Sequence, residues 1–332
     1  MSRRTHWTLA AVAIVQIFAA GLSADDDPFA EDPPQVNPQG RQALIVCGLP
    51  GDVDHRKLFA ETVEKLYAGL TTRLGCTPEH TTVLFSDEAT DKDGPALRAS
   101  RGLATREKLA EVVDEAQSSL KPDDALWVFV LGHAHFDGRF SWLNLPGPDM
   151  NQVEFGKLFA PIACREQVFF MTTPVSGFFI KPLAAAGRIV IAATEADAEV
   201  NETIFPVGLA SALADPPVMQ EFDVDGDGRS TLLDVYLWSA RATAQEYATG
   251  ELLATEHSLL DDDGDGRGSE VQLDYLNEEL GGRLRAGRNR PTPRAGEGAR
   301  ARTILLPMPP LSKPEEAKAK ESSGAVGDAT QF

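Results

Sequence analysis

Short apolar runs alternate with segments of helical periodicity from residue 43 to residue 193 of this 332-residue chain. The runs have the length of buried strands, and the segments between them carry apolar residues at three- and four-residue spacing. Such alternation is typical of a parallel sheet with helices on both faces. The pattern predicts a doubly wound α/β fold with strands at 43–47, 82–85, 125–131, 167–171 and 188–193, and helices at 57–74, 106–120 and 153–159.

Polar and small residues follow the predicted strands. Gly48 follows the first, His133 the third, and the run from Thr172 to Gly177 the fourth. In an open α/β sheet, ligands bind at the carboxyl ends of the strands. A catalytic dyad there needs a nucleophile and a base on neighbouring strand ends. The sequence therefore places a candidate site at this edge, with His133 as its base.

The residues around two of these strands resemble the legumain-type cysteine peptidases of the caspase–hemoglobinase fold. In that family one apolar strand ends in His-Gly, and another ends in an acidic residue, Ala, Cys, a variable residue, Ser and Gly. Here His133 matches the catalytic histidine, and Ser176 and Gly177 match the Ser-Gly. Pro174 falls on the nucleophile, and Thr172 falls on the acidic residue that helps shape the specificity pocket. The resemblance implies the fold more strongly than the activity.

A third match lies at the end of the first strand. The segment 47–51 followed by Arg56 resembles the family's C-G-x-x-G-x-x-x-x-R, whose arginine helps bind the P1 side chain. Ala134 departs from the family by replacing the glycine after the histidine. The resemblance extends over about residues 43–213, which is most of the predicted globular part.

Proline at position 174 excludes thiol catalysis there, because its side chain carries no nucleophile and its ring fixes φ. Thr172 also removes the counter-charge that a basic P1 side chain would need. We therefore expect a pseudopeptidase that acts by binding a peptide or protein ligand. The sequence leaves three alternatives open: a cysteine peptidase with a thiol elsewhere, a hydrolase that uses Ser176 with His133, and a structural calcium-binding protein of the cell envelope.

His133 and His135 point the same way if they lie on one strand, so with Asp137 they could chelate a transition metal. A transition-metal site needs further ligands, and no other histidine is expected nearby except His55. We therefore favour a surface role for His135.

Aspartates recur at alternate positions near the end of the folded part. Asp223, Asp225, Asp227 and Asp234 occupy positions 1, 3, 5 and 12 of a loop that resembles EF-hand or dockerin-like calcium loops. A glycine at position 6 permits the tight turn, and Arg229 offers a backbone carbonyl at position 7. The sequence therefore predicts a Ca²⁺ site. Aspartate at position 12, instead of glutamate, has a shorter reach.

A second loop repeats the spacing but is incomplete. Asp261, Asp263 and Asp265 match positions 1, 3 and 5, whereas position 12 is Gln272. The sequence leaves open whether this loop binds metal. Helices are predicted after the two loops, at 232–247 and 269–280, and the sequence divides the chain into an α/β domain at 42–215 and a small helical region at 216–282.

The two ends of the chain differ in composition from its middle. Residues 1–24 combine Arg3 and Arg4 with a short apolar core and small residues, which is typical of a secretory signal peptide rather than a membrane span. Residues 25–41 are acidic and proline-rich, and residues 283–332 are basic and then low in complexity, so both are predicted to be disordered. We expect a secreted, periplasmic or cell-envelope protein.

Charge and cysteine content narrow the function classes. The net charge of −19 disfavours nucleic-acid binding, and no stretch beyond the signal is long enough to span a bilayer. Cys47 lies in an apolar strand and is expected to be a buried hydrophobe, while Cys164 precedes the fourth strand and should lie at the edge opposite His133. A disulfide between Cys76 and Cys164 is not decided by sequence.

Overall fold

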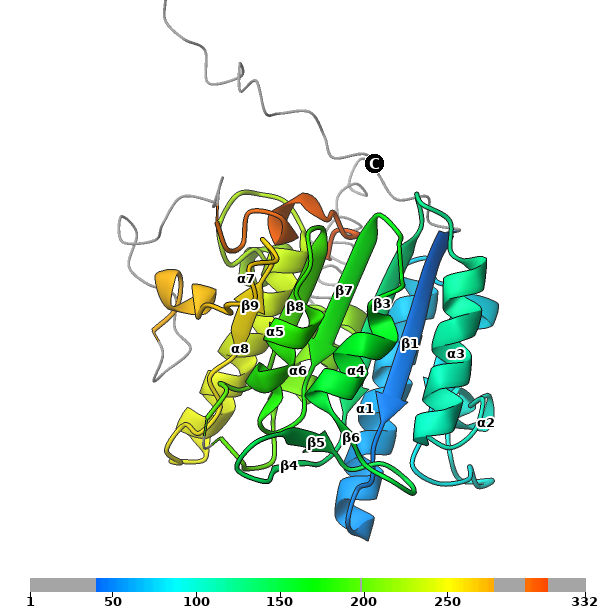
Figure 1. Cartoon of the computed structure of the whole chain (residues 1–332). Coiled ribbons are helices and arrows are strands. Elements are labelled where there is room, and N and C mark those ends of the chain that lie inside the picture. The colour runs from blue at the N-terminus through cyan, green and yellow to red at the C-terminus, as the bar shows by residue number, and fades with distance from the viewer. Residues whose placement is uncertain (1–39, 198, 278–295, 310–332) are drawn as a thin grey trace, which may run out of the picture. The chain divides into compact units, whose positions relative to one another are not determined.

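A six-stranded sheet forms the centre of the molecule in the computed structural model, which describes residues 40–197, 199–277 and 296–309 (Figure 1). The strand order is β2-β1-β3-β7-β8-β9, and every pair is parallel except β8 with β9. The predicted doubly wound α/β fold is confirmed. The strands are β1 Arg41–Cys47, β2 Thr81–Leu84, β3 Ala125–Leu131, β7 Glu166–Met171, β8 Arg188–Ala192 and β9 Leu259–Asp261.

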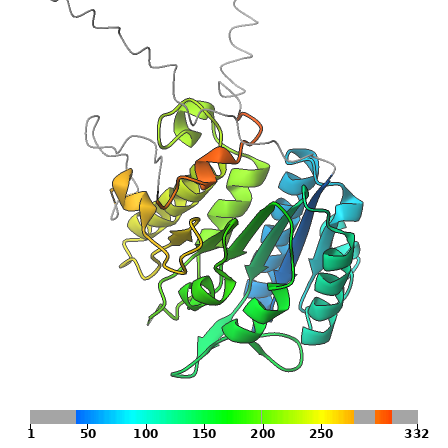
Figure 2. The same cartoon turned by 45° about the horizontal axis from the view of Figure 1, so that its top comes forward.

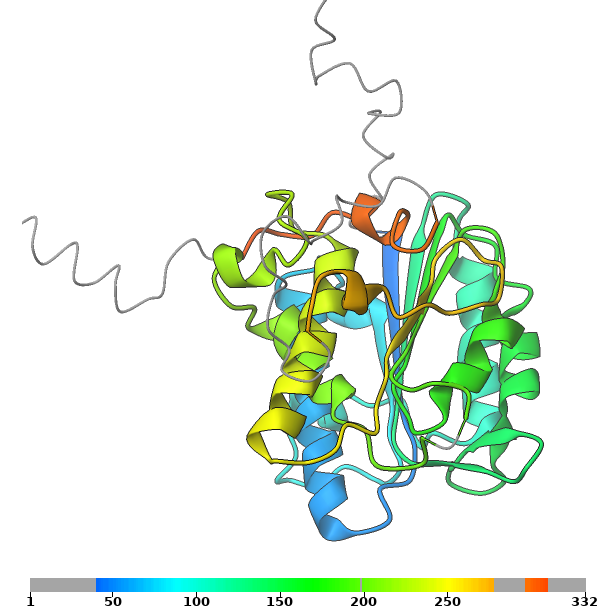
Figure 3. The same ribbon diagram turned by 90° about the vertical axis from the view of Figure 1, so that its left-hand side faces the viewer.

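Helices cover both faces of the sheet, as the edge-on view in Figure 3 shows. Helices α1, α6 and α8 cover one face, and α3, α4 and α5 cover the other. The helices are α1 Val53–Thr72, α2 Pro95–Arg98, α3 Arg106–Ser119, α4 Gln152–Phe159, α5 Ile180–Leu183, α6 Phe205–Ala214, α7 Met219–Phe222 and α8 Leu232–Thr249. Short 3₁₀ turns are η2 Pro78–His80, η3 Ser176–Phe179, η4 Val271–Asp274 and η5 Ala301–Thr303.

The apolar runs of the sequence are strands that are buried on both faces. All of β3 is buried, and its side chains alternate between the two cores. Phe129 packs on the α1 side, whereas Val130 packs on the α3 side. Each fully buried side chain of this kind contributes about 1.5–3 kcal/mol, so burial on both faces stabilises the strand, as is usual in parallel sheets.

A small three-stranded antiparallel sheet, β4-β5-β6, lies beyond the carboxyl end of β3, at the bottom of Figure 1. Its strands are β4 Ala134–Phe136, β5 Ser141–Leu143 and β6 Met150–Asn151. The sequence pattern did not predict these strands, because each is too short for an alternation to be visible.

The region after residue 215 shares the core of the α/β part. Strand β9 extends the main sheet, and α8 contributes Leu232 and Tyr236 to the core on the α1 side. The helix predicted at 269–280 is wrong within the described residues, where only the η4 turn forms. The side-chain nitrogen of Gln272 donates to the Ser258 carbonyl at 3.1 Å. The side-chain oxygen of Gln272 accepts from the hydroxyl of Tyr236 on α8, so this segment is attached to α8.

Part of the tail predicted to be disordered is folded. Figure 2 shows residues 296–309, in orange, lying against α8. The Leu232 amide donates to the Ile304 carbonyl at 3.0 Å, and the Leu306 amide donates to the Ser230 carbonyl at 2.8 Å. Ile304 is buried in the core on the α1 side, and Leu306 packs against this core. These contacts hold the segment in place, and its composition did not predict them. The predicted signal peptide and residues 25–39 lie outside the described residues, as do 278–295 and 310–332.

Among the described helices, none is long and apolar enough to cross a membrane.

Glu166 holds together the amino ends of three strands. The indole nitrogen of Trp127 donates to its carboxylate at 2.6 Å, and a guanidinium nitrogen of Arg41 lies 3.6 Å from the same oxygen. All three side chains are buried. We predict that Glu166→Ala lowers the free energy of unfolding by about 3–5 kcal/mol, because a buried cation loses its partner. Glu166→Gln, which keeps an acceptor, should lose less.

Chemical denaturation gives the free energy of unfolding of both variants. The exposed Glu61, which lies 3.9 Å from Lys57, supplies the control, since Glu61→Ala should change stability by less than about 0.5 kcal/mol. Equal losses in Glu166→Ala and Glu61→Ala would contradict the prediction.

Candidate functional site

His133 lies just beyond the carboxyl end of β3, with both ring nitrogens occupied. Gly132 takes φ 120° where its backbone closely approaches Gly48, so the chain can turn there. The Nε2 atom of His133 lies 2.8 Å from the Pro50 carbonyl oxygen, and Nδ1 lies 2.7 Å from a carboxylate oxygen of Glu202. A carbonyl only accepts, so Nε2 carries a proton. Both of these partners lie outside the turn after β7.

The turn after β7 occupies the place that the family resemblance gives to the nucleophile. Strands β3 and β7 pair in parallel, so Pro174 lies at the same sheet edge as His133. Pro174 is buried, and the next residue, Val175, has a left-handed backbone with φ 50°. This conformation costs a residue with a Cβ about 1–2 kcal/mol. It is held by the Val175 amide, which donates to the Glu199 carbonyl at 3.0 Å.

Ser176 and Gly177 have structural roles in this turn. The Ser176 hydroxyl is fully buried and lies 3.1 Å from the hydroxyl of Thr194, whose backbone amide also donates to it. A Cβ on Gly177 would lie 2.5 Å from the Ala196 amide nitrogen, so only glycine fits. This geometry gives no support to a hydrolase in which His133 activates Ser176.

The two residues assigned to the substrate pocket have their polar groups bound by other groups of the protein. The Thr172 side chain donates to the Val130 carbonyl at 2.8 Å and is buried. Arg56, in the first turn of α1, makes a bidentate pair with Asp93 at 3.0 Å and donates to Asp87 at 2.7 Å. Hydrogen bonding to Arg56 holds the pKa of Asp93 well below its usual value. The positive charge of Arg56 is therefore balanced by two carboxylates of the protein itself.

The two histidines proposed to chelate metal with Asp137 are separated in the structure. His135, on β4, lies 2.7 Å from the side-chain oxygen of Asn144 and is exposed. Asp137 accepts from the Trp142 indole at 2.8 Å and from two backbone amides. Among the described residues, His133 gathers instead with His55 and Glu202.

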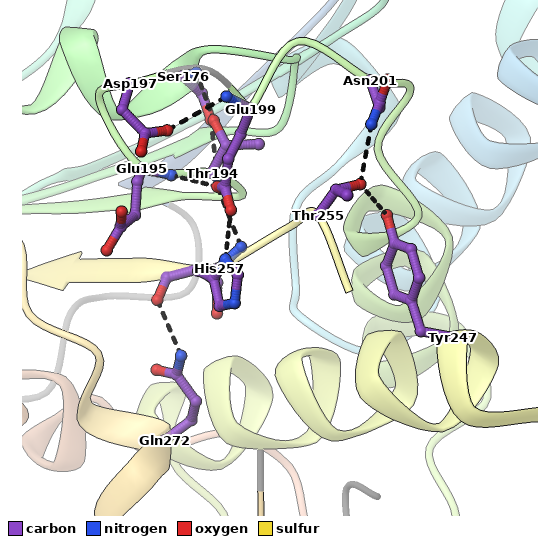
Figure 4. A network of polar contacts seen from close by, with 11 residues as sticks. Ser176, Thr194, Glu195, Asp197, Glu199, Asn201, Tyr247, Thr255, His257 and Gln272 are labelled. Atoms are coloured by element: carbon purple, nitrogen blue, oxygen red, sulfur yellow. Dashed lines mark hydrogen bonds and ion pairs between the residues drawn. The ribbon is translucent and has the colours of Figure 1, made fainter. Parts of the chain in front are cut away.

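Glu202 is the residue of this edge that the sequence pattern missed. It lies in the loop between β8 and α6, which Figure 4 shows tied to the segment before β9 by polar contacts. The amides of Glu195 and His257 donate to Glu199 at 2.7 and 3.1 Å. The Asn201 side chain donates to the Thr255 hydroxyl at 3.1 Å. A search for carboxylates in every loop at the carboxyl edge would have found Glu202 as a candidate.

A groove of about 850 Å³ opens beside Glu202, between α6, α8 and the loop after α8. Its lining is largely apolar and includes Trp238, Leu252 and Leu253. The two leucines are adjacent in sequence and 63% and 85% exposed, so they form an exposed apolar patch. Glu202 and Glu246 supply negative charge, so the groove suits an apolar ligand with a positive group.

The first aspartate loop has the predicted tight turn. The amides of Gly226 and Gly228 donate to the two carboxylate oxygens of Asp223 at 2.8 and 3.0 Å. Asp223, Asp225 and Asp227 bring carboxylate oxygens within 4.8 Å of one another. One oxygen each of Asp225 and Asp227 is buried without a hydrogen-bond partner.

The electrostatics of this loop follow from crowding. Burial, and then the neighbouring Asp227, raise the pKa of Asp225 to about 6. Asp234 lies in the first turn of α8, where its side chain accepts from the Thr231 amide at 3.0 Å and from the Val224 amide at 3.1 Å. The Arg229 amide donates to Asp227 at 2.9 Å.

The second aspartate loop repeats this geometry directly after β9. Asp261 accepts from the amides of Gly264 and Gly266 at 2.8 and 2.9 Å. Glu297, from the folded part of the tail, brings a carboxylate within 4.8 Å of those of Asp261, Asp263 and Asp265. The sequence could not identify Glu297, because it lies far along the chain in a segment predicted to be disordered.

No protein-family model and no curated protein sequence matches this chain. Among solved structures, the crystal structure of the Drosophila initiator caspase Dronc is similar, with a TM-score of 0.41 and 11% sequence identity. The match covers 70% of this chain and 85% of that chain. The strand order and the parallel pairing of this chain by themselves establish its α/β fold.

The three cysteines are free and shielded. Cys47 ends β1 at the His133 edge but is fully buried, and burial raises its pKa well above the usual value. Burial also raises the pKa of Cys76 and of Cys164 to about 11. At pH 8 a thiol with that pKa is a thiolate in about one molecule in a thousand.

We predict that the folded protein reacts with iodoacetamide at least about a hundredfold more slowly than the unfolded protein at pH 8, because the thiolates are scarce and covered. Mass spectrometry with peptide mapping locates each adduct. Cys164→Ser, which removes the half-buried thiol, controls for slow surface labelling. Rapid labelling of Cys47 in the folded state would contradict the prediction and restore a cysteine peptidase as a candidate.

Proposed function

We propose that the protein is a legumain-like pseudopeptidase that acts by binding a peptide or protein segment. The observation that carries this proposal is the state of the dyad positions: Pro174 is buried in a turn, and both nitrogens of His133 are held by Pro50 and Glu202. A base in that state has no nucleophile to activate. The predicted signal peptide supports a secreted, periplasmic or cell-envelope location.

The groove beside Glu202 supports binding as the remaining function. It is apolar, exposed and continuous with the edge where the family binds substrate, through Glu202 itself. The ligand that fits this surface is an extended apolar segment with a basic side chain near Glu202 or Glu246.

We predict that the protein binds such a peptide without cleaving it. Leu253→Asp should weaken binding of an apolar peptide with one lysine by at least about tenfold, which is 1.4 kcal/mol, because it puts a charge into the apolar lining. Trp238 fluorescence gives the affinity, and mass spectrometry of the incubated peptide tests for cleavage. Met308→Asp, at a 54% exposed residue outside the groove, is the matched control.

Pro174→Cys adds a test of the lost nucleophile. It restores a thiol at the nucleophile position, yet turnover should stay weak because Glu202 and Pro50 still hold His133. Cleavage by the wild type that iodoacetamide blocks, or that Ser176→Ala abolishes, would overturn the pseudopeptidase. Equal peptide affinities in Leu253→Asp and Met308→Asp would overturn the groove as the binding surface.

We also propose that the two aspartate loops bind Ca²⁺. Crowded carboxylates and partnerless buried oxygens at Asp225 and Asp227 support the first site. Carboxylate and carbonyl oxygens are the ligands that Ca²⁺ prefers. Glu297 supports the second site, because it adds the fourth carboxylate that Gln272 cannot supply.

We predict that Ca²⁺ raises the melting temperature and that the gain has two separable parts. A ligand at a hundred times its Kd stabilises the folded state by about 2.7 kcal/mol. Asp225→Asn should remove the contribution of the first loop, and Glu297→Gln that of the second. Calorimetric titration up to millimolar Ca²⁺ measures the stoichiometry of each variant. An absence of binding in this range would leave the loops as turns only.

A further inference from the structure

Two histidines and one carboxylate converge at the carboxyl edge of the sheet. His55, from the first turn of α1, His133, after β3, and Glu202, from the loop before α6, bring one ligand atom each within 4.8 Å of one another. The imidazole rings meet edge to face, with centroids 5.0 Å apart. Three elements that are far apart in sequence thus place two nitrogens and one oxygen around a common point.

One ring nitrogen of each histidine contacts a group outside this cluster. Nδ1 of His55 lies 2.7 Å from the Asp52 carboxylate, and Nε2 of His133 lies 2.8 Å from the Pro50 carbonyl. Metal-binding histidines almost always donate their second ring N–H to a carboxylate or a backbone carbonyl in this way. The nitrogens left for a ligand are Nε2 of His55 and Nδ1 of His133.

Glu202 is held in place by its neighbours on both sides. The Asn201 side chain donates to the Thr255 hydroxyl at 3.1 Å, and the Thr203 hydroxyl donates to the Thr172 carbonyl at 2.5 Å (Figure 4 shows the former contact). Glu202 is only half-buried and also lines the apolar groove. The cluster is therefore fixed by the fold, yet accessible from solvent.

We propose that His55, His133 and Glu202 form a binding site for a divalent transition-metal ion, with Zn²⁺ the best match. Imidazole nitrogens favour Zn²⁺, Cu²⁺ or Ni²⁺ over Ca²⁺ and Mg²⁺, and two histidines with one carboxylate suit tetrahedral Zn²⁺ with an open fourth position. The ion would take the place of the direct contact between Nδ1 of His133 and Glu202. The fourth position would be left for water or for a ligand carboxylate or carbonyl.

The proposal does not rest on calcium binding or on peptide binding, although Glu202 belongs both to this cluster and to the lining of the groove. The competing account is an ion pair, in which a protonated His133 simply neutralises Glu202. The two accounts differ in what a metal does to His133: a metal displaces any proton on Nδ1, whereas an ion pair keeps it.

Cobalt(II) is a suitable probe, because its visible d–d spectrum reports ligand number and geometry. The full chain is titrated with Co²⁺ in excess Ca²⁺, which occupies the aspartate loops. We expect one Co²⁺ per chain with an intense visible band that Zn²⁺ displaces. His55→Gln and Glu202→Gln should each abolish the band. Far-ultraviolet circular dichroism confirms that both variants fold.

Two further variants separate coordination from general loss of structure. Asp52→Asn keeps the helix cap that accepts from the His55 amide, but weakens the orienting contact, so the affinity should fall about 10- to 100-fold. His135→Gln, at an exposed histidine outside the cluster, should leave the band unchanged. A band that persists in His55→Gln, or a proton on Nδ1 of His133 that survives excess Zn²⁺ in ¹⁵N-imidazole NMR, would overturn the proposal.

Discussion

The parallel pairing of β1, β3, β7 and β8 is the constraint on which the rest of the molecule depends. Parallel strands that are buried on both faces must end at one edge, and the loops that leave that edge must meet there. This edge gathers His133, the Pro174 turn and the loop that carries Glu202. Buried Glu166 secures the opposite ends of the same strands.

The side chains at this edge hold one another and the backbone in place. The positions that resemble a peptidase site are tied into the fold: Arg56 pairs with two aspartates, Thr172 caps the Val130 carbonyl, and His133 has a partner at each nitrogen. The left-handed backbone of Val175 makes the turn after β7 a strained part of this edge. The groove beside Glu202 is open to solvent, which is why we propose a binding function for this surface.

The region after residue 215 completes the site rather than forming a separate module. Glu256 accepts from the Ile204 and Phe205 amides at 2.8 Å and so caps α6, directly after the Glu202 loop. Strand β9 leads from this segment straight into the second aspartate loop, where Glu297 meets it. An ion in that loop would therefore stabilise the sheet edge and the folded part of the tail together.

The sequence by itself determined five strands of the main sheet, their parallel direction and the edge at which His133 and Pro174 lie, because buried strands need continuous apolar runs wherever they occur. It did not reveal β9 or the small β4-β5-β6 sheet. It did not reveal α6, which is apolar on all sides and lacks a helical period. Nor did it reveal Glu202, Glu297 or the folding of residues 296–309. These features depend on contacts between segments far apart in the chain. A carboxylate in a loop becomes a ligand or a partner only when the tertiary structure brings an imidazole or other carboxylates within a few ångströms.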